Sequence, residues 1–397
     1  MTASESGKPV VIRNVRIWDG VSDRYLQEAD ALRIEGASIT AVGVTRELRE
    51  GAEVRDGAGQ TVIPGLIDCH VHLCIDPEVR SALDQPTGEA VRDQMIGRVE
   101  RMVRAGITTA RDLGGGEWWE LEVRDRIAAG AIPGPRLLCA GQPITSPGGH
   151  CHFWGGEASD AREALEVLAR QESKGVDLIK VMATGGNLTP NSRPSDAQFE
   201  QDVLEAIVVA ARGFGHHVAA HCHGTSGIRN AAFAGVRTIE HCSWVGPNGW
   251  GADFLQDVAE YIAGAGIFVS PTVNSGWKRH EGRNEHVARL GENFDRLRAA
   301  GGRLIASTDA GIPGVAHDDL PGALPWFSRF ARLTPVETLK AATSEAAEAV
   351  GLGQVTGRLA PGYAADLVFL DGDPLRDLGV LGSAASVVAR GRSIELR

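Results

Sequence analysis

The sequence predicts an α/β protein: a (β/α)8 TIM barrel joined to a small β-sandwich that is built from both chain ends. Three observations favour this fold class. Eight apolar segments alternate with stretches of helical periodicity through the middle of the chain. Short β-like segments occupy both ends. Histidine and aspartate residues stand at the ends of several apolar segments, where the functional side chains of a barrel gather.

The two chain ends share a β-like texture of short apolar runs separated by turns that contain glycine. These segments are residues 10–18, 31–35, 38–42, 362–373 and 386–395. Neither end is long enough to make a good β core alone. We therefore expect one discontinuous β-sandwich formed by residues 1–64 and 355–397.

The middle of the chain, residues 65–354, is expected to form the barrel. The strand candidates lie near residues 66–73, 107–113, 136–142, 177–183, 217–222, 237–242, 266–272 and 303–309. Helical stretches between or after them, such as 160–170, 197–210 and 335–350, place apolar residues three and four positions apart. An open, doubly wound sheet of eight strands would show the same alternation, so the pattern alone leaves both architectures open.

Five residues at strand ends favour the barrel over the open sheet. They are His70, His72, His221, His241 and Asp309, on the first, fifth, sixth and eighth strand candidates. In an open sheet these ends would lie too far apart to meet, whereas a closed barrel brings them to one mouth. His70 and His72 alternate along one strand, so both imidazoles point to the same side and can bind one metal ion. A chance pair of histidines on a half-buried strand is the alternative for this motif alone.

Lys180 stands in the middle of the fourth apolar strand candidate. A lysine buried there without a partner is unfavourable, so the side chain needs an interaction. One interpretation is a salt bridge to Asp177 or Glu240. The other is that the uncharged amine captures carbon dioxide and becomes a carbamate whose two oxygens bridge two metal ions.

The charge and the cysteines restrict the class of protein. A formal net charge of -11 argues against nucleic acid or an anionic membrane as a partner, because both require a basic face. Residues 1–8 lack the apolar core of a signal peptide and no run approaches about 18 apolar residues, so we expect a cytoplasmic protein. The six cysteines are scattered and are expected to be reduced. Cys151, Cys222 and Cys242 adjoin histidines, but neighbours on a strand face opposite sides, which disfavours them as ligands.

At this point the sequence resembles the amidohydrolase superfamily. Its pattern of a His-x-His pair, a lysine on the fourth strand, two later histidines and a final aspartate is matched by His70, His72, Lys180, His221, His241 and Asp309. The segments 134–136, 147–150, 180–186 and 307–311 are similar to its prolidase-like and imidazolonepropionase-like branch. The resemblance spans almost the whole chain.

The resemblance implies a site with two divalent metal ions. His70, His72 and Asp309 would hold the more buried ion, and His221 and His241 the more exposed one. Carboxylated Lys180 and a hydroxide would bridge both ions. These ligands suit zinc best, with manganese, iron and cobalt as alternatives. The hydroxide would attack a carbonyl that a metal polarises, and Asp309 would pass the proton to the leaving nitrogen.

Several further residues are predicted to act in catalysis or to contact the substrate. Asp309, His241 and His150 are the predicted catalytic residues, and His150 would donate to a substrate carbonyl or carboxylate. The predicted substrate contacts are His150, His223, Trp154, Trp244 and Arg193. The tryptophans suggest an aromatic pocket. A cation, preferably an arginine, would hold a terminal carboxylate, and Arg193, Lys278 and Arg279 are available for it. Packing of the loops alone is the alternative for the tryptophans.

The resulting prediction is a metal-dependent amidohydrolase that cleaves an amide or peptide bond. The favoured substrate is a dipeptide of the Xaa-Pro type or an N-acyl amino acid. A hydrolase of a cyclic or aromatic amide, a carbamate or a lactone is the second hypothesis, and a non-catalytic barrel homologue is the third. The expected partner is a small-molecule substrate, and a homo-oligomer is left open.

Overall fold

Eight parallel strands lie at the centre of the protein, whose computed structural model describes residues 8–81, 84–282 and 285–396. One sheet contains β7 (Leu66–Val71), β8 (Ile107–Asp112) and β9 (Arg136–Cys139). A second contains β10 (Ile179–Met182), β11 (Val218–Gly224), β12 (Thr238–Val245), β13 (Phe268–Ser270) and β14 (Arg303–Leu304). All neighbouring strands in both sheets run parallel. The eight strands fall within or overlap the eight segments predicted from apolar patterning.

The two parallel sheets touch at both edges. Beyond β9, Ile144 forms a parallel bridge with Val181 of β10. At the other edge, Val71 of β7 forms a parallel bridge with Ala310, a few residues after β14. The first bridge joins the segment after β9 to β10. The second places the segment after the last strand beside the first strand, which carries the His-x-His pair.

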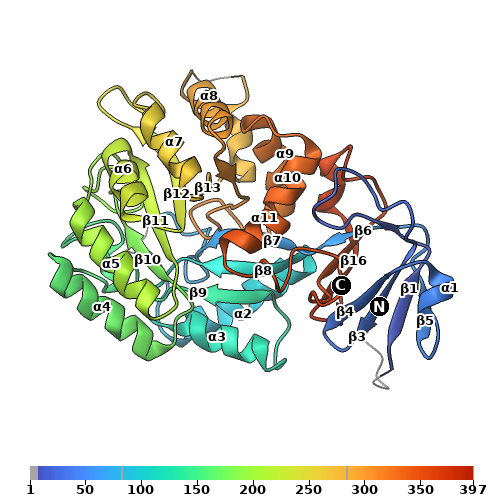
Figure 1. Ribbon diagram of the computed structural model, residues 1–397. Coiled ribbons are helices and arrows are strands. Elements are labelled where there is room, and N and C mark those ends of the chain that lie inside the picture. The colour runs from blue at the N-terminus through green and yellow to red at the C-terminus, as the bar shows by residue number, and fades with distance from the viewer. Residues whose placement is uncertain (1–7, 82–83, 283–284, 397) are drawn as a thin grey trace.

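Helices follow the strands and pack around them (Figure 1). They are α2 (Glu89–Arg104), α3 (Trp119–Ala128), α4 (Ala161–Lys174), α5 (Gln201–Gly213), α6 (Thr225–Ala234), α7 (Gln256–Gly264) and α8 (Glu285–Ala299), then α9 (Leu320–Phe330), α10 (Pro335–Ala341) and α11 (Ser344–Ala349). Short 3-10 turns occur at η2 (His152–Trp154), η3 (Ser275–His280) and η4 (Leu378–Gly382).

The fourth helix shows how the sequence specifies these elements. The side chain of Asp160 accepts a hydrogen bond from the Glu163 backbone N–H, which satisfies one of the free donors at the start of α4. Ala164, Val167 and Leu168 are buried at helical spacing and face the core. Gly175 ends the helix in a left-handed conformation.

Two predicted helices differ from the observed ones. The helix expected from residue 197 begins at Gln201, because Ala197 forms an antiparallel bridge with Thr184. The helix expected over 335–350 is divided into α10 and α11 at Thr343, whose backbone leaves the helical region with φ -135° and ψ -93°. Hydrophobic periodicity gives no signal for this break, because buried residues recur at helical spacing both before and after Thr343.

Strands from both chain ends pair in one five-stranded sheet of order β17-β16-β15-β6-β2. Its members are β2 (Arg16–Ile17), β6 (Thr61–Pro64), β15 (Leu367–Leu370), β16 (Ala384–Ala389) and β17 (Arg392–Ile394). A four-stranded sheet of order β4-β3-β1-β5 contains β1 (Val10–Arg13), β3 (Ala31–Glu35), β4 (Ser38–Gly43) and β5 (Glu53–Asp56), with the short helix α1 (Thr45–Leu48) beside it.

The two terminal sheets share a buried apolar cluster that is separate from the cluster around the parallel strands. Ile12, Leu32 and Ile39 of the N-terminal segments pack in it with Leu367 and Phe369. Figure 1 shows both chain ends on the same side of the molecule. The domain boundaries at 64/65 and 354/355 stay predictions.

Within the described ranges, no helix is both long and apolar enough to cross a bilayer. The expectation about a signal peptide rests mainly on residues 1–7, which lie outside the described residues.

Candidate metal centre

Three potential ligand atoms converge at the end of β7. The Nε2 atoms of His70 and His72 lie 3.2 Å apart. Asp309, which follows β14, places its Oδ1 atom 3.2 Å from Nε2 of His70 and 3.5 Å from Nε2 of His72. All three side chains line one cavity. The predicted ligand set of the first ion is therefore brought together by two strands that are distant in sequence.

The hydrogen bonds around His70 and His72 fix which nitrogen faces the cluster. Nδ1 of His70 lies 3.0 Å from Oε2 of Glu240, and Nδ1 of His72 lies 2.9 Å from the carbonyl oxygen of Gly114. Both partners accept hydrogen bonds, so each Nδ1 carries the proton and each Nε2 presents a lone pair.

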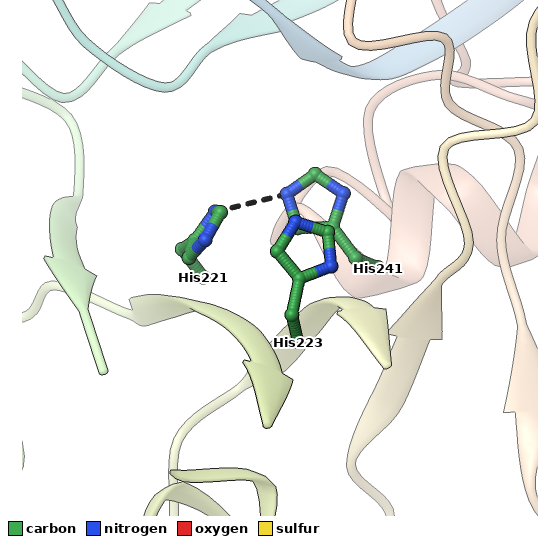
Figure 2. Close-up of side chains that lie close together, drawn as sticks. All are labelled: His221, His223 and His241. Carbon is green, nitrogen blue, oxygen red and sulfur yellow. Dashed lines mark hydrogen bonds between the residues drawn. The ribbon is translucent and has the colours of Figure 1, made fainter. Parts of the chain in front are cut away.

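A second cluster lies at the ends of β11 and β12 (Figure 2). Nε2 of His241 lies 3.0 Å from Nδ1 of His221. His221 donates from Nε2 to the carbonyl of Gly185 at 3.0 Å. The Thr272 hydroxyl donates to the Pro271 carbonyl, so it accepts the hydrogen bond from Nδ1 of His241 at 2.8 Å. The two facing nitrogens of His221 and His241 are consequently both lone pairs.

His223 joins this second cluster. The potential ligand atoms of His221, His223 and His241 all lie within 4.8 Å of one another. The rings of His223 and His241 are stacked with centroids 4.3 Å apart, and Nδ1 of His223 lies 2.9 Å from the Ser243 hydroxyl. The sequence predicted His223 as a substrate contact, and the structure places it within reach of the same ion as His221 and His241.

Facing lone pairs are unfavourable unless a cation lies between them. In each cluster two imidazole nitrogens oppose each other without a proton, and the first cluster adds a carboxylate oxygen. Imidazole nitrogen and carboxylate oxygen are ligands that zinc and related divalent ions prefer. The residues present therefore fit a divalent ion in each cluster.

Lys180 lies in the same cavity and is fully buried. Its Nζ atom has no hydrogen-bond partner in the part of the chain that the structure describes. Burial lowers the pKa of the Lys180 amine. Its two candidate salt-bridge partners are occupied elsewhere, Asp177 by Arg124 and Glu240 by Arg111, each at 2.8 Å. The salt-bridge interpretation of Lys180 is therefore wrong for this structure.

The electrostatics of the cavity keep the histidines neutral. Burial, together with the nearby Lys180 charge, lowers the pKa of His72 to about 3. Burial likewise places the pKa values of His70, His221 and His241 well below the ordinary value. Neutral imidazoles are the form that binds metal ions. Burial also raises the pKa of Asp309 to about 7.

A buried ion pair contacts the first cluster through His70. Arg111 donates to Oε1 of Glu240 at 2.8 Å, to the Thr238 hydroxyl at 3.0 Å and to the Cys69 carbonyl at 2.7 Å. Arg111 and Glu240 are both at most 2% exposed. The ion pair neutralises Glu240 while its second oxygen orients His70. No sequence pattern indicated Arg111, and Glu240 was predicted only as a possible salt-bridge partner of Lys180.

The backbone at the cluster is held in a left-handed conformation. His241, Thr272 and Asp309 have φ values of 65°, 55° and 60°. Such values are uncommon for residues with a side chain and collect at functional sites. Asp68 restrains this region, since its carboxylate accepts hydrogen bonds from the backbone N–H groups of His70 and Thr308. The alternation of strand side chains gives no signal for this geometry.

The clusters lie in a cavity of about 770 Å³. Of the predicted substrate contacts, His150, His223 and Trp154 line this cavity. Trp250 and Trp277 also line it. Its wall thus carries three indole rings, which agrees with the predicted aromatic pocket.

Two predicted substrate contacts, Trp244 and Arg193, do not line the cavity. The Trp244 indole is 1% exposed, packs on Phe254 with centroids 4.6 Å apart, and is not part of the cavity wall. Arg193 is 77% exposed, pairs with Asp196 at 2.9 Å, and is also absent from the wall. Arg279 of η3 occupies the wall instead.

The cysteines beside the histidines are not part of either ligand cluster among the described residues. Cys151, Cys222 and Cys242 are buried free thiols, and burial raises the pKa of the Cys151 thiol to about 12. Cys151 alone of these three lines the cavity. That the thiols are not ligands stays a prediction.

His150 is held at the wall by its neighbours. Its backbone N–H donates to Oε1 of Gln198 at 2.6 Å, and its ring lies 4.6 Å from that of His221. A Cβ atom on Gly186 would come within 2.5 Å of Nε2 of His150, so the glycine permits this ring position. Nδ1 of His150 is buried without a hydrogen-bond partner in the described ranges. A ligand in the cavity could satisfy that atom.

The chain is similar in sequence to several known proteins. The sequence model of the Amidohydrolase family matches residues 61–394. The chain is 29% identical over 361 residues to ochratoxinase of Aspergillus niger, covering 82% of this chain and 73% of that protein. It is 28% identical over 415 residues to imidazolonepropionase of Chloroflexus aggregans, covering 92% and 90%.

A solved structure is similar over the whole length. It is a prolidase complexed with N-methylphosphonate-L-proline, with a TM-score of 0.84 and 27% identity, covering 98% of this chain and 99% of that chain. The branch inferred from sequence motifs is confirmed by these similarities. Since the family pattern extends over most of the chain, the protein belongs to the amidohydrolase family and is a hydrolase of that superfamily.

Proposed function

We propose that the protein hydrolyses the amide bond of an N-acyl amino acid or a dipeptide with the help of two divalent metal ions. His70, His72 and Asp309 would hold one ion, and His221 and His241 the other, with His223 within reach of the second. Zinc suits these ligands best, and manganese, iron and cobalt are alternatives. Lys180, carboxylated, would bridge the two ions.

One observation carries this proposal: unprotonated ligand atoms face each other in two clusters, and a buried amine without a partner lies in the same cavity. Lys180 lines the same cavity as the histidines of both clusters. A carbamate would turn this unsatisfied cation into an anion with two ligand oxygens. The bridges at both sheet edges support a closed (β/α)8 barrel as the frame of the site.

The bound ions would supply a water of lowered pKa and polarise the substrate carbonyl. The residues of the chain have their own tasks. Asp309 presents Oδ1 to His70 and His72, so its second carboxylate oxygen can accept a proton and return it to the leaving nitrogen. His150 holds an unpartnered ring nitrogen at the wall and would donate a hydrogen bond to a substrate oxygen. Trp154 and the surrounding apolar side chains exclude bulk water.

The carboxylate of such a substrate requires a cation at the cavity mouth. Arg80 and Arg279 both line the cavity and are exposed. A guanidinium binds a carboxylate with two parallel hydrogen bonds, which favours a substrate with a free carboxyl group. Arg279 is one of the cations that the sequence offered beside Arg193, and Arg80 is not among them.

A second candidate is hydrolysis of an aromatic amide. The cavity wall includes Trp250, Trp277 and Phe294 in addition to Trp154. Such a wall binds a flat ring with favourable stacking. An N-aroyl amino acid would satisfy both the aromatic wall and the arginines.

The test is a hydrolysis screen of dipeptide and N-acyl amino acid libraries with zinc- or manganese-loaded enzyme. The Asp309→Asn variant serves as background for contaminating activity. Release of amino acid by the wild type alone supports the proposal. No turnover of any carboxylate-bearing amide, while neutral aromatic amides or lactones are cleaved, would favour the alternative substrates. Fewer than one bound metal per chain with bicarbonate supplied would favour a non-catalytic homologue.

A further inference from the structure

A second cavity of about 310 Å³ lies behind Trp154, and nothing in the catalytic centre uses it. Trp154 and Leu188 line both cavities and form the partition between them. The second cavity also reaches Thr87 and Glu117, which are exposed residues. It therefore has a rim of its own at the molecular surface and does not depend on the catalytic cavity for access.

The walls of this second cavity are mainly apolar and aromatic. They include Ile75, Val91, Met95, Trp119 and Phe153. Its volume lies at the lower end of the range of small-molecule sites and suits a single ring. Basic side chains are absent from this wall among the described residues, so a negatively charged ligand would find no partner there.

Two polar atoms at the wall lack partners. Oε1 of Glu120 and Nε1 of Trp119 are both buried without a hydrogen bond within residues 8–81, 84–282 and 285–396. Glu120 as a whole is only 1% exposed. A buried polar group without a partner costs about 1–3 kcal/mol, so such groups in a native protein require an explanation. One donor and one carboxyl group beside the same apolar cavity match a ligand that both accepts and donates.

The partition between the cavities is fixed. The Trp154 ring lies 5.4 Å from that of His72 and 5.6 Å from that of Phe153. A Cβ atom on Gly116 would meet Cδ1 of Trp154 at 3.1 Å, so the indole packs closely on that backbone. A substrate tail would have to displace this indole to enter the second cavity. A free molecule that enters at the rim would not.

We propose that the second cavity binds a free, uncharged aromatic molecule that carries one hydroxyl group. The ring fills the apolar wall, Nε1 of Trp119 donates to the hydroxyl oxygen, and the hydroxyl donates to Oε1 of Glu120. Burial raises the pKa of the Glu120 carboxyl, which favours its neutral form and is compatible with a neutral ligand. The bound molecule contacts the face of Trp154, whose ring also lies against the metal ligand His72.

The probe for this proposal is 4-fluorophenol, with fluorobenzene as the matched molecule without a hydroxyl. Binding to the full-length protein is measured by fluorine NMR, with metal loaded and after chelation, so that direct contact of the phenol with a metal ion is detected. We expect binding that survives chelation. Trp119→Phe keeps an aromatic side chain but removes the N–H and part of the indole surface, so it should weaken 4-fluorophenol about tenfold more than it weakens fluorobenzene, the value of one hydrogen bond.

Two further variants locate the site. Val91→Phe fills the second cavity and should abolish binding of both probes, with its thermal melting curve confirming the fold. Trp277→Ala alters only the catalytic cavity and should leave binding unchanged. Loss of binding in Trp277→Ala, loss on chelation, or equal affinity of Trp119→Phe and wild type for 4-fluorophenol would overturn the proposal. These binding measurements do not depend on turnover, so they stand apart from the proposed hydrolase activity.

Discussion

Glu240 and His70 form a fully buried pair in which a carboxylate oxygen lies 3.0 Å from Nδ1 of the imidazole. This contact makes Nε2 of His70 the free nitrogen. In Glu240→Gln the negative charge is lost and Arg111 is left without its anion. We expect the affinity for the first metal ion to fall about 10–100-fold, as for other partners of metal-binding histidines. Chelator competition measures this loss.

The control for that variant is Glu260→Gln, an exposed position on α7. It should bind metal like the wild type. If Glu240→Gln retained full metal affinity, the orienting role of Glu240 would be wrong, whatever its effect on stability.

Lys180→Ala removes the buried amine that we propose to be carboxylated. The expected result is loss of activity by at least about a hundredfold and a metal content below two ions per chain, because a bridging ligand is missing. Addition of a short carboxylic acid should restore part of the activity. Metal analysis and rate measurements with acetate or propionate test this, and unchanged metal content would contradict the bridging role.

Gly186→Ala tests the position of His150. The new methyl group would lie within 2.5 Å of Nε2 of His150, and the ring must move. We expect kcat/KM to fall about 10–100-fold, as for loss of a positioned hydrogen-bonding group, while metal content is retained. Gly213→Ala, where no atom lies within 4 Å, is the matched control. Equal kinetics of the two variants would argue against a role for His150.

Trp277→Ala removes an indole from the wall of the catalytic cavity. For a substrate with an aromatic acyl group, KM should rise about tenfold, whereas a small aliphatic substrate should be affected less. Trp244→Phe, a change outside the cavity, should leave both KM values unchanged. A uniform effect of Trp277→Ala on all substrates would show that the residue only stabilises the loop.

The stability of the protein should respond to pH through Glu120. Burial and the Asp112 charge raise the pKa of Glu120 from an ordinary value of 4.5 to about 8. The Arg124 charge acts in the opposite direction. The thiols of Cys74 and Cys139 lie in the same environment and remain protonated, since burial raises their pKa values. The neutral form is favoured by folding, so this contribution is complete below pH 4.5 and is lost as the pH rises through 8.

Glu120→Gln cannot ionise and should therefore lose less thermal stability between pH 5 and pH 8.5 than the wild type, by a few degrees in Tm. Glu122→Gln on the same helix is the control and should follow the wild type. Identical pH profiles for Glu120→Gln and wild type would show that Glu120 is not strongly perturbed.

The strands, and the residues that we propose as ligands, could be identified because each carries a local signal. His70 and His72 end an apolar strand, and their spacing alone places both rings on one side. His221, His241 and Asp309 likewise stand at strand ends. Their convergence follows from parallel topology, which alternation of strand and helix indicates.

The remaining parts of the site depend on contacts that no local pattern contains. Arg111 pairs with Glu240 across 129 residues of sequence. Trp244 was misplaced because it was assigned to the segment after the sixth strand, whereas β12 extends through it to Val245 and its ring packs on Phe254. The second cavity depends on the packing of Trp119 and Trp154 from different segments, and sequence spacing gives no distance between them.

The five-stranded terminal sheet has a consequence for synthesis of the chain. β6 pairs with β15, so that Val62 lies opposite Phe369. While the ribosome is still producing the central strands, β6 can pair with β2, but its edge toward β15 has no partner. A chain interrupted before residue 367 should therefore expose this edge to aggregation, and the edge is covered only once β15 has emerged.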